Sequence, residues 1–208
     1  MHHSVIVGIL AAAGLLTGCA TPGSQIAAQG KNDLANVVSC CNTLADARNV
    51  PLPRKSRVEI DKTRQAFTFD GGKSFFVLYQ LPQFSQTYSI VLRSQPGGMM
   101  SNASIFLPRV MLLDESFRQT RHFAETGLRS RGDVFERTVF INPANNSERY
   151  IAIYGADLAA PLNRVLSVVT TTSSQIFSWS SGADVQATLH PSSVGAFDIE
   201  TFDLPDEK

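Results

Sequence analysis

After residue 53 the chain has a succession of short apolar runs, some of which alternate with polar residues as half-buried β-strands do. Short runs rich in Val, Ile, Phe and Tyr are separated by Gly, Pro, Asn or Asp, which favour turns. Many short strands in succession are typical of a β-sandwich, and we expect a mainly β, jelly-roll-like sandwich domain. The runs that predict strands lie at 58–60, 66–69, 74–79, 87–93, 103–107, 110–113, 134–141, 149–154 and 196–202.

Two stretches depart from this alternation. Apolar residues recur at helical spacing between Asn32 and Ala47, so we expect a short amphipathic helix there, ending before Pro51 and preceding the sandwich. The residues that set this spacing are Leu34, Val37, Val38, Cys41 and Leu44. The second stretch, 157–181, has leucines at helical spacing, but its Ser/Thr run favours a loop or strand. We expect this stretch to leave the sandwich.

The N-terminal sequence has the pattern of an export signal. An apolar run from Val5 to Leu16 leads into Thr17-Gly18-Cys19, where two small residues precede a thiol that can accept a diacylglycerol. The run is too short for a helix to cross a hydrocarbon core of roughly 30 Å. No Lys or Arg precedes it, which departs from the usual signal. Residues 1–18 are predicted to be a lipoprotein signal peptide, with Cys19 as the lipidated residue.

The predicted lipid on Cys19 indicates how the mature chain is attached and divided. Two or three acyl chains on Cys19 would hold the mature protein on a membrane, and Ala20, rather than Asp, follows the cysteine, which favours the outer membrane. Small and polar residues predict a flexible tether over 19–31. Residues 32–208 are then expected to form one domain in the periplasm.

Cys40 and Cys41 need an explanation, because the periplasm is oxidising and unpaired thiols are uncommon there. Neighbouring Cα atoms lie about 3.8 Å apart, whereas relaxed disulfides need about 4.4–6.8 Å, so a bond between the two would be strained. We therefore expect Cys41 to pack on the buried face of the helix, with Cys40 nearer its edge. A redox or intermolecular role is the alternative.

Charge and motifs exclude several classes of function. Eighteen basic residues balance eighteen acidic ones, so no net charge attracts nucleic acid. After the predicted signal only His122 and His190 are histidines, and neither has metal-ligand spacing or a serine-hydrolase motif beside it. We expect no metal, no cofactor and no enzymatic activity. A glycosidase would need two facing carboxylates, and the sequence does not identify such a pair.

Aromatic side chains are the remaining candidates for binding. Sugar-binding sandwiches stack aromatic rings on pyranose faces, which makes Trp179, Tyr79 and Tyr154 candidate sugar-binding residues. Core packing explains the tyrosines equally well. Trp179 stands in a Ser-rich stretch where a role in the core is not obvious.

Several segments together resemble the MalM family, the periplasmic proteins encoded with maltose uptake genes. The resemblance lies in the lipobox, in Cys40-Cys41 and in the order of three runs: 69–76 (FDGGKSFF) leading to Leu81-Pro82, 110–114 (VMLLD) and 149–154 (RYIAIY). It implies a periplasmic protein associated with maltose or maltodextrin transport, without catalytic residues. The chain differs in carrying a lipidation signal and in the segment from Leu158 to Ser181.

Three functions remain possible: two that do not involve catalysis, described here, and an enzyme such as a glycosidase as the third. The first is a membrane-anchored periplasmic lipoprotein that is an accessory of carbohydrate transport and contacts oligosaccharide or a transport component. The alternative is a structural or assembly lipoprotein of the cell envelope that acts through protein–protein contacts, for which a flat, partly apolar patch would be the signature.

Overall fold

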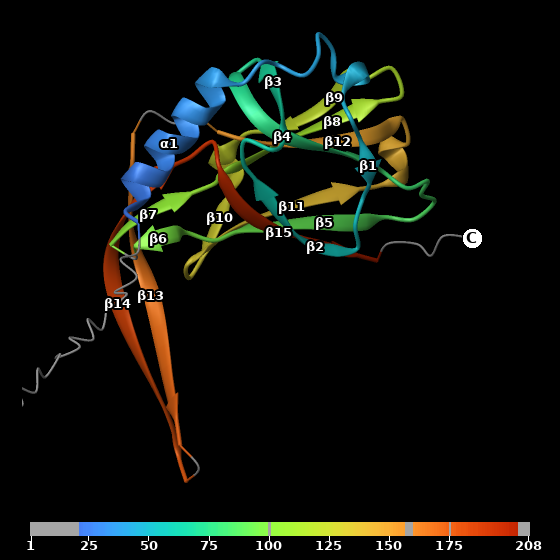
Figure 1. Ribbon diagram of the computed structural model, residues 1–208. Coiled ribbons are helices and arrows are strands. Elements are labelled where there is room, and N and C mark those ends of the chain that lie inside the picture. The colour runs from blue at the N-terminus through green and yellow to red at the C-terminus, as the bar shows by residue number, and fades with distance from the viewer. Residues whose placement is uncertain (1–20, 100, 157–159, 175, 204–208) are drawn as a thin grey trace, which may run out of the picture.

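The computed structural model describes residues 21–99, 101–156, 160–174 and 176–203. Two β-sheets pack face to face, and a third, smaller sheet adjoins them at one end (Figure 1). One helix, α1 (Gly23–Asn36), precedes the strands. The prediction of a mainly β sandwich preceded by a short helix is therefore confirmed. Each of the nine predicted runs contains a strand.

The first sheet has the strand order β1-β4-β12-β8-β9, with β3 pairing off this path with β4. Its central pairs, β4–β12 and β12–β8, are antiparallel, whereas the short β1 runs parallel to β4. The bounds are β1 (Val50–Pro51), β3 (Gln65–Phe69), β4 (Gly72–Gln80), β8 (Pro108–Asp114), β9 (Gln119–Phe123) and β12 (Glu148–Gly155).

The second sheet is antiparallel throughout, in the order β10-β11-β5-β15-β2. Its strands are β2 (Lys55–Ile60), β5 (Tyr88–Ser94), β10 (Arg129–Arg131), β11 (Val134–Ile141) and β15 (Gly195–Phe202). Three short 3-10 helices, η1 (Leu44–Asp46), η2 (Glu125–Gly127) and η3 (Pro143–Asn145), lie in the connections.

The third sheet, β13-β14-β7-β6, contains the stretch that we expected to leave the sandwich. Its strands are β6 (Gly97–Met99), β7 (Asn102–Ile105), β13 (Leu162–Ser173) and β14 (Ser178–Pro191). Only the last residues of β14, from Thr188 to Pro191, pair with β7. The rest of β13 and β14 forms a two-stranded ribbon that projects away from the body (Figure 1).

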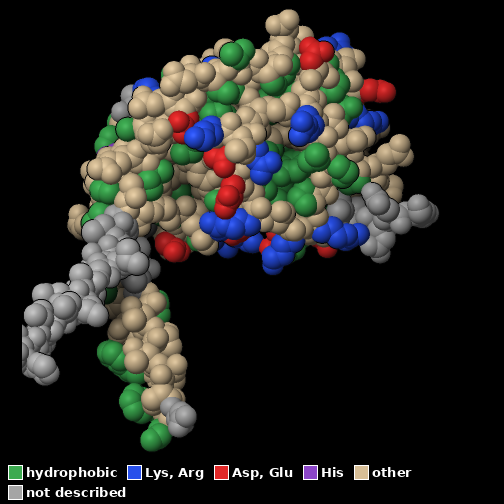
Figure 2. All heavy atoms as spheres, viewed as in Figure 1, with side chains coloured by type: hydrophobic (Ala, Val, Ile, Leu, Met, Phe, Trp, Pro, Cys, Tyr) green, Lys and Arg blue, Asp and Glu red, His purple; other side chains and the backbone are tan. Residues whose placement is uncertain are grey.

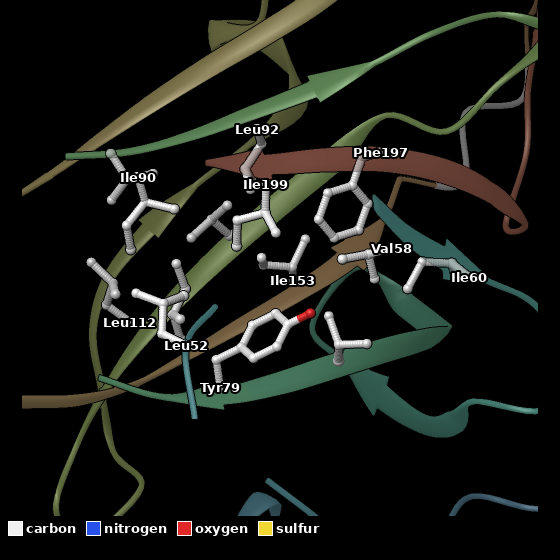
Figure 3. Close-up of a cluster of buried hydrophobic side chains, with 14 of the residues drawn as sticks. Leu52, Val58, Ile60, Tyr79, Ile90, Leu92, Leu112, Ile153, Phe197 and Ile199 are labelled. Atoms are coloured by element: carbon white, nitrogen blue, oxygen red, sulfur yellow. The ribbon is translucent and has the colours of Figure 1, made fainter. Parts of the chain in front are cut away.

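The main core lies between the first and second sheets. Figure 3 shows side chains from both sheets meeting there, with Ile153 and Leu112 on one side and Ile90 and Phe197 on the other. All four are buried, and each comes from the inward-facing positions of its strand. A second buried cluster covers the opposite face of the first sheet and includes Phe69, Phe76, Leu78, Met111, Leu113 and Tyr154.

Burial on both faces explains why the strands of the first sheet are apolar without interruption. In β4 the run from Ser74 to Tyr79 is buried at every position, because odd positions enter the main core and even positions enter the second cluster. In the second sheet, the last part of β11 alternates instead: Val139 and Ile141 are buried, whereas Thr138 and Phe140 are exposed.

The predicted bounds of the helix are wrong. Beyond Asn36 the backbone becomes extended at Val37, and only η1 is helical in the remainder of 37–47. The apolar residues that suggested one helical face contact two different cores: Val37 packs on the main core, whereas Cys41 and Leu44 belong to the second cluster. One helix cannot present a single face to both sides of a sheet, so the chain crosses between them in extended form.

The prediction of a flexible tether is wrong for residues 23–30, which are helical and closely packed. A Cβ added to Gly23 would lie 1.9 Å from the carbonyl carbon of Ala103, so only glycine allows α1 to approach β7 this closely. The Ser24 amide also donates to Oδ1 of Asn102, at 3.0 Å. The small residues that suggested a linker instead allow α1 to pack closely against β7.

Cys40 and Cys41 are joined by a disulfide, contrary to the expectation that the strain of neighbouring residues would keep them apart. Neither residue is helical, so the helical geometry assumed for them does not apply. The Cys40 amide donates to the carbonyl of Ala66 at 2.8 Å, and Cys41 packs against the second cluster. The packing role expected for Cys41 is present, in an extended segment rather than on a helix.

Candidate functional site

A groove runs between α1 and the connection from β2 to β3. We call it the α1 groove; it consists of two adjoining hollows of about 480 and 380 Å³ that share Ile26, Asp61 and Val194. The helix contributes Gln25, Gln29 and Asp33, which are spaced four residues apart and therefore lie along one face. The end nearer β15 is lined by Arg57, Glu59, Gln95 and Phe106 among others.

Hydrogen bonds fix the polar groups of the α1 groove. Asp61 accepts from the amide of Thr63 at 2.8 Å and from its hydroxyl at 2.6 Å, and the hydroxyl bond is the main reason why the pKa of this carboxyl lies below its usual value. On the helix, Nε2 of Gln29 donates to Oδ1 of Asp33 at 2.8 Å. An ionised carboxylate and primary amides beside apolar Ile26 and Val194 provide the kind of lining that binds hydroxylated ligands.

The carboxyl of Asp61 differs from the general acid of a glycosidase. A glycosidase needs one carboxyl with a raised pKa as its general acid, whereas the pKa of Asp61 is lowered. Over the residues that the structure places, no group of three or more His, Cys, Asp or Glu side chains could hold a metal ion.

The three aromatic residues proposed for sugar binding are not brought together. Tyr79 and Tyr154 are both buried, Tyr79 in the main core and Tyr154 in the second cluster on the other face of the same sheet. The ring of Tyr154 is stacked on Phe69, and its hydroxyl lies 3.0 Å from Nε2 of His122. Trp179 is exposed and lies near the tip of the β13–β14 ribbon. Cys19, the predicted lipidation site, lies outside the described residues.

The groove residues were missed because the sequence around them was assigned to a tether. Gln25, Gln29 and Asp33 share a helix face, and this spacing of four was a signal in the sequence that the expected helix bounds concealed. Asp61 carries no such signal, because its place opposite α1 depends on the packing of the helix on the sandwich.

The β13–β14 ribbon is the second unusual surface. Its two strands pair from Leu162–Leu189 out to Ser173–Ser178, and a turn closed by a bond from the Ser174 amide to the Phe177 carbonyl joins them. No charged residue occurs between Arg164 and Asp184. Figure 2 shows the projecting arm free of Lys, Arg, Asp and Glu, in contrast to the body. No helix in the described part of the chain is long and apolar enough to cross a membrane.

Comparison with known proteins gives one match. A search of curated proteins finds none similar to this chain. A scan of protein families finds that residues 71–160 match the family described as maltose operon periplasmic protein precursor (MalM). The matched segment runs from β4 to β12 and leaves out α1, the ribbon and β15. The central segment of this chain, residues 71–160, thus matches the MalM family, and the resemblance seen in the sequence is confirmed.

Proposed function

We propose that this chain is a periplasmic accessory protein of carbohydrate uptake, held at the outer membrane by a lipid on Cys19. The observation that carries the proposal is the match of residues 71–160 to a family described as a periplasmic protein of the maltose operon. The lipobox sequence Leu16-Thr17-Gly18-Cys19 supports the anchor.

The α1 groove is our candidate for the glycan contact. Its lining combines Gln25, Gln29, Asp33 and Asp61 with two apolar side chains, so sugar hydroxyls would find both donors and acceptors. Of the three aromatic candidates only Trp179 is open to a ligand in this structure, and it stays a second candidate for stacking on a sugar ring. Maltodextrins are the first ligands to test, because of the family description.

Calorimetric titration of the purified lipoprotein with maltose, maltodextrins and cellodextrins tests the glycan contact. We expect saturable binding of maltodextrins, weakened roughly fivefold to tenfold by Gln29→Ala, since one lost hydrogen bond is worth about 1 kcal/mol. Lys31→Ala is the matched control, because Lys31 is exposed on the same helix and does not line the groove. Loss of binding in Trp179→Ala, with Gln29→Ala unchanged, would move the site to the ribbon.

The alternative is a structural or assembly lipoprotein of the cell envelope that acts through protein–protein contacts. It would be supported if no glycan bound while the protein co-purified with an envelope component after cross-linking in intact cells. The anchor is tested separately by mass spectrometry of the N-terminal fragment. We expect an acylated Cys19 in the natural chain and an unacylated, uncleaved precursor in Cys19→Ser.

A further inference from the structure

One face of strand β14 is apolar from the core to the tip of the ribbon. Side chains alternate between the two faces of a strand, so odd-numbered positions of β14 share one face. With Ser181 as the exception, these positions carry Trp179, Ala183, Val185, Ala187 and Leu189, and Phe177 in the turn continues the series. The even-numbered positions carry polar groups or glycine, including Ser178, Ser180 and Asp184.

Only the root of this apolar face is covered by the protein. Ala187 and Leu189 are buried in a cluster with Ile105 and Phe135. Further out, Trp179 and Phe177 are 62% and 65% exposed, and Ile176 in the turn is 93% exposed. An aromatic tip that stands so far from its own core indicates a contact with something outside the chain.

The chemistry of the ribbon fits a lipid surface. From Val165 to Ala183 there is no charged side chain that would have to be desolvated, and hydroxyl groups of Thr170, Thr172 and Ser181 share the face with Trp179. Tryptophan is enriched at the boundary between headgroups and acyl chains, because its ring is apolar and its N–H remains hydrogen-bonded. The apolar members of the opposite face, Val165 and Val169, come from β13 alone.

The start of the described chain, Thr21, lies beside the strands at the root of this ribbon. The carbonyl of Thr21 lies 2.7 Å from the point where a Cβ on Gly98 of β6 would stand, and Gly23 packs on β7. Strand β7 is the one that pairs with the root of β14. A lipid on Cys19 would be joined to Thr21 through two residues of chain, which span at most about 7 Å.

These lengths restrict how the ribbon can meet a membrane. Ten residues separate Thr188, at the root, from Ser178 near the tip, a span of roughly 33 Å. If the ribbon stood upright with only its tip on the bilayer, Thr21 at its root would be roughly 33 Å from the membrane surface. A lipid on Cys19 could not reach the bilayer from there. With Cys19 acylated, the ribbon can touch the bilayer only by lying along it.

We propose that the β13–β14 ribbon is a second membrane contact, which lies along the bilayer with the face of Phe177, Trp179 and Val185 toward the lipid. The inference rests on the lipid anchor of the proposed function. Contact at two points fixes the orientation of the body, whereas a lipid alone would leave it free to rotate. The contact is uncharged from Val165 to Ala183, and Arg164, opposite Ala187 at the root, is the charged residue on this face, so the contact should depend little on anionic lipids or on salt.

Trp179 provides the test, because it is the only tryptophan of the chain. The natural lipoprotein is reconstituted into detergent-free vesicles of neutral phosphatidylcholine. Its tryptophan fluorescence is compared with that in vesicles of the same lipid with brominated acyl chains. We expect emission shifted to shorter wavelength, quenching by the brominated lipid and protection from aqueous iodide, all unchanged at high salt. The matched control is the double variant Trp179→Phe and Ser180→Trp, which moves the indole to the polar face and should restore iodide quenching without lipid quenching.

Two results would overturn the proposal. One is a Trp179 that is quenched by iodide and not by brominated lipid. The other is a Trp179 emission that shifts to shorter wavelength without quenching by brominated lipid, in samples that also give cross-linked dimers. That result would mean that the ribbon contacts a second copy of the chain instead of the lipid. Mass spectrometry of Cys19 in the same samples separates these results from failure of the anchor: an acylated Cys19 with an iodide-exposed tryptophan refutes the ribbon contact alone.

Discussion

The ring of Tyr154 lies flat against the ring of Phe69, with centroids 3.8 Å apart and planes 4° apart. Phe69 closes strand β3 and Tyr154 lies in β12, so the pair links two strands that are not neighbours in the first sheet. The stacking position that a sugar ring would occupy on Tyr154 is thus filled by the protein itself. We therefore expect Tyr154 to contribute to the stability of the domain.

Loss of this ring pair should destabilise the domain strongly. Phe69→Ala removes a buried ring and leaves a cavity, and we expect a loss of about 3–5 kcal/mol in the free energy of unfolding. Urea denaturation followed by tyrosine fluorescence or circular dichroism measures it. Phe140→Ala is the control, because Phe140 is 59% exposed and its loss should change stability by less than about 0.5 kcal/mol. Equal effects for both would show that the second cluster contributes little.

Arg121 and Glu148 form an ion pair in which the carboxylate is buried and the guanidinium partly exposed, and we expect losing one partner to cost more stability than replacing both. Glu148 is 1% exposed and accepts from Arg121 at 2.6 Å (Nε to Oε1) and 2.7 Å (Nη2 to Oε2). Arg121→Ala leaves that carboxylate without its cation, and we expect a loss of roughly 3 kcal/mol. Replacing both residues by Met should cost less than the single change.

An exposed ion pair serves as the comparison for this experiment. Arg118 pairs with Asp114 across a turn, and its side chain is 80% exposed. Arg118→Ala should therefore change the free energy of unfolding by less than about 1 kcal/mol. A double-mutant cycle on Arg121 and Glu148 measures their coupling energy. A coupling energy below about 1 kcal/mol would contradict the assignment of a strong pair.

Stability should fall in acid partly because of Glu125. The Arg109 guanidinium donates to Oε2 of Glu125 at 2.6 Å and lowers the pKa of that carboxyl below its usual value of 4.5. A folded-state pKa below the unfolded one contributes stability that is complete above pH 4.5 and is lost as the pH falls through the folded-state value. Urea midpoints measured from pH 7 to pH 3 should fall less steeply in Glu125→Gln than in the natural chain. Parallel slopes would show that this pair does not contribute.

The docking of α1 should depend on the absence of a side chain at residue 23. Gly23→Ala would push the helix away from Ala103 at a cost of about 1–3 kcal/mol. Hydrogen exchange of the α1 amides measures the effect, and we expect faster exchange from Gln25 to Leu34. Asn32→Ala, an exposed change on the same helix, should leave the exchange unchanged.

Local patterns predicted the strands well, because each buried position had to be apolar whatever its partner. The run at 74–79 is a case in point, since both of its faces are covered. Pairing was not predictable, because a strand such as β15 carries no local mark of lying between β5 and β2. The helix was misplaced because Val37, Cys41 and Leu44 have helical spacing by coincidence while contacting opposite sides of the first sheet.

The candidate site was less predictable than the fold. Tyrosines at 79 and 154 are amphipathic, so the sequence could not distinguish a buried ring from an exposed one. Trp179 was recognised as unusual, but its place at the end of a ribbon follows from the register of β13 on β14, which extends for twelve residue pairs. The α1 groove arises only when a helix, a turn and β15 come together, and no single segment encodes it.

The close approach of Gly23 to Ala103 also determines how the protein would respond to mechanical force. A chain pulled from a point ahead of residue 21 has almost no slack, because α1 is packed on the third sheet from its first residue. Tension therefore acts on the contact between α1 and β7 before it reaches the sandwich, and the helix would detach while both main sheets stay folded. If the proposed lipid anchor pulled on the chain, the contact of Gly23 with Ala103 would therefore give way before the core does.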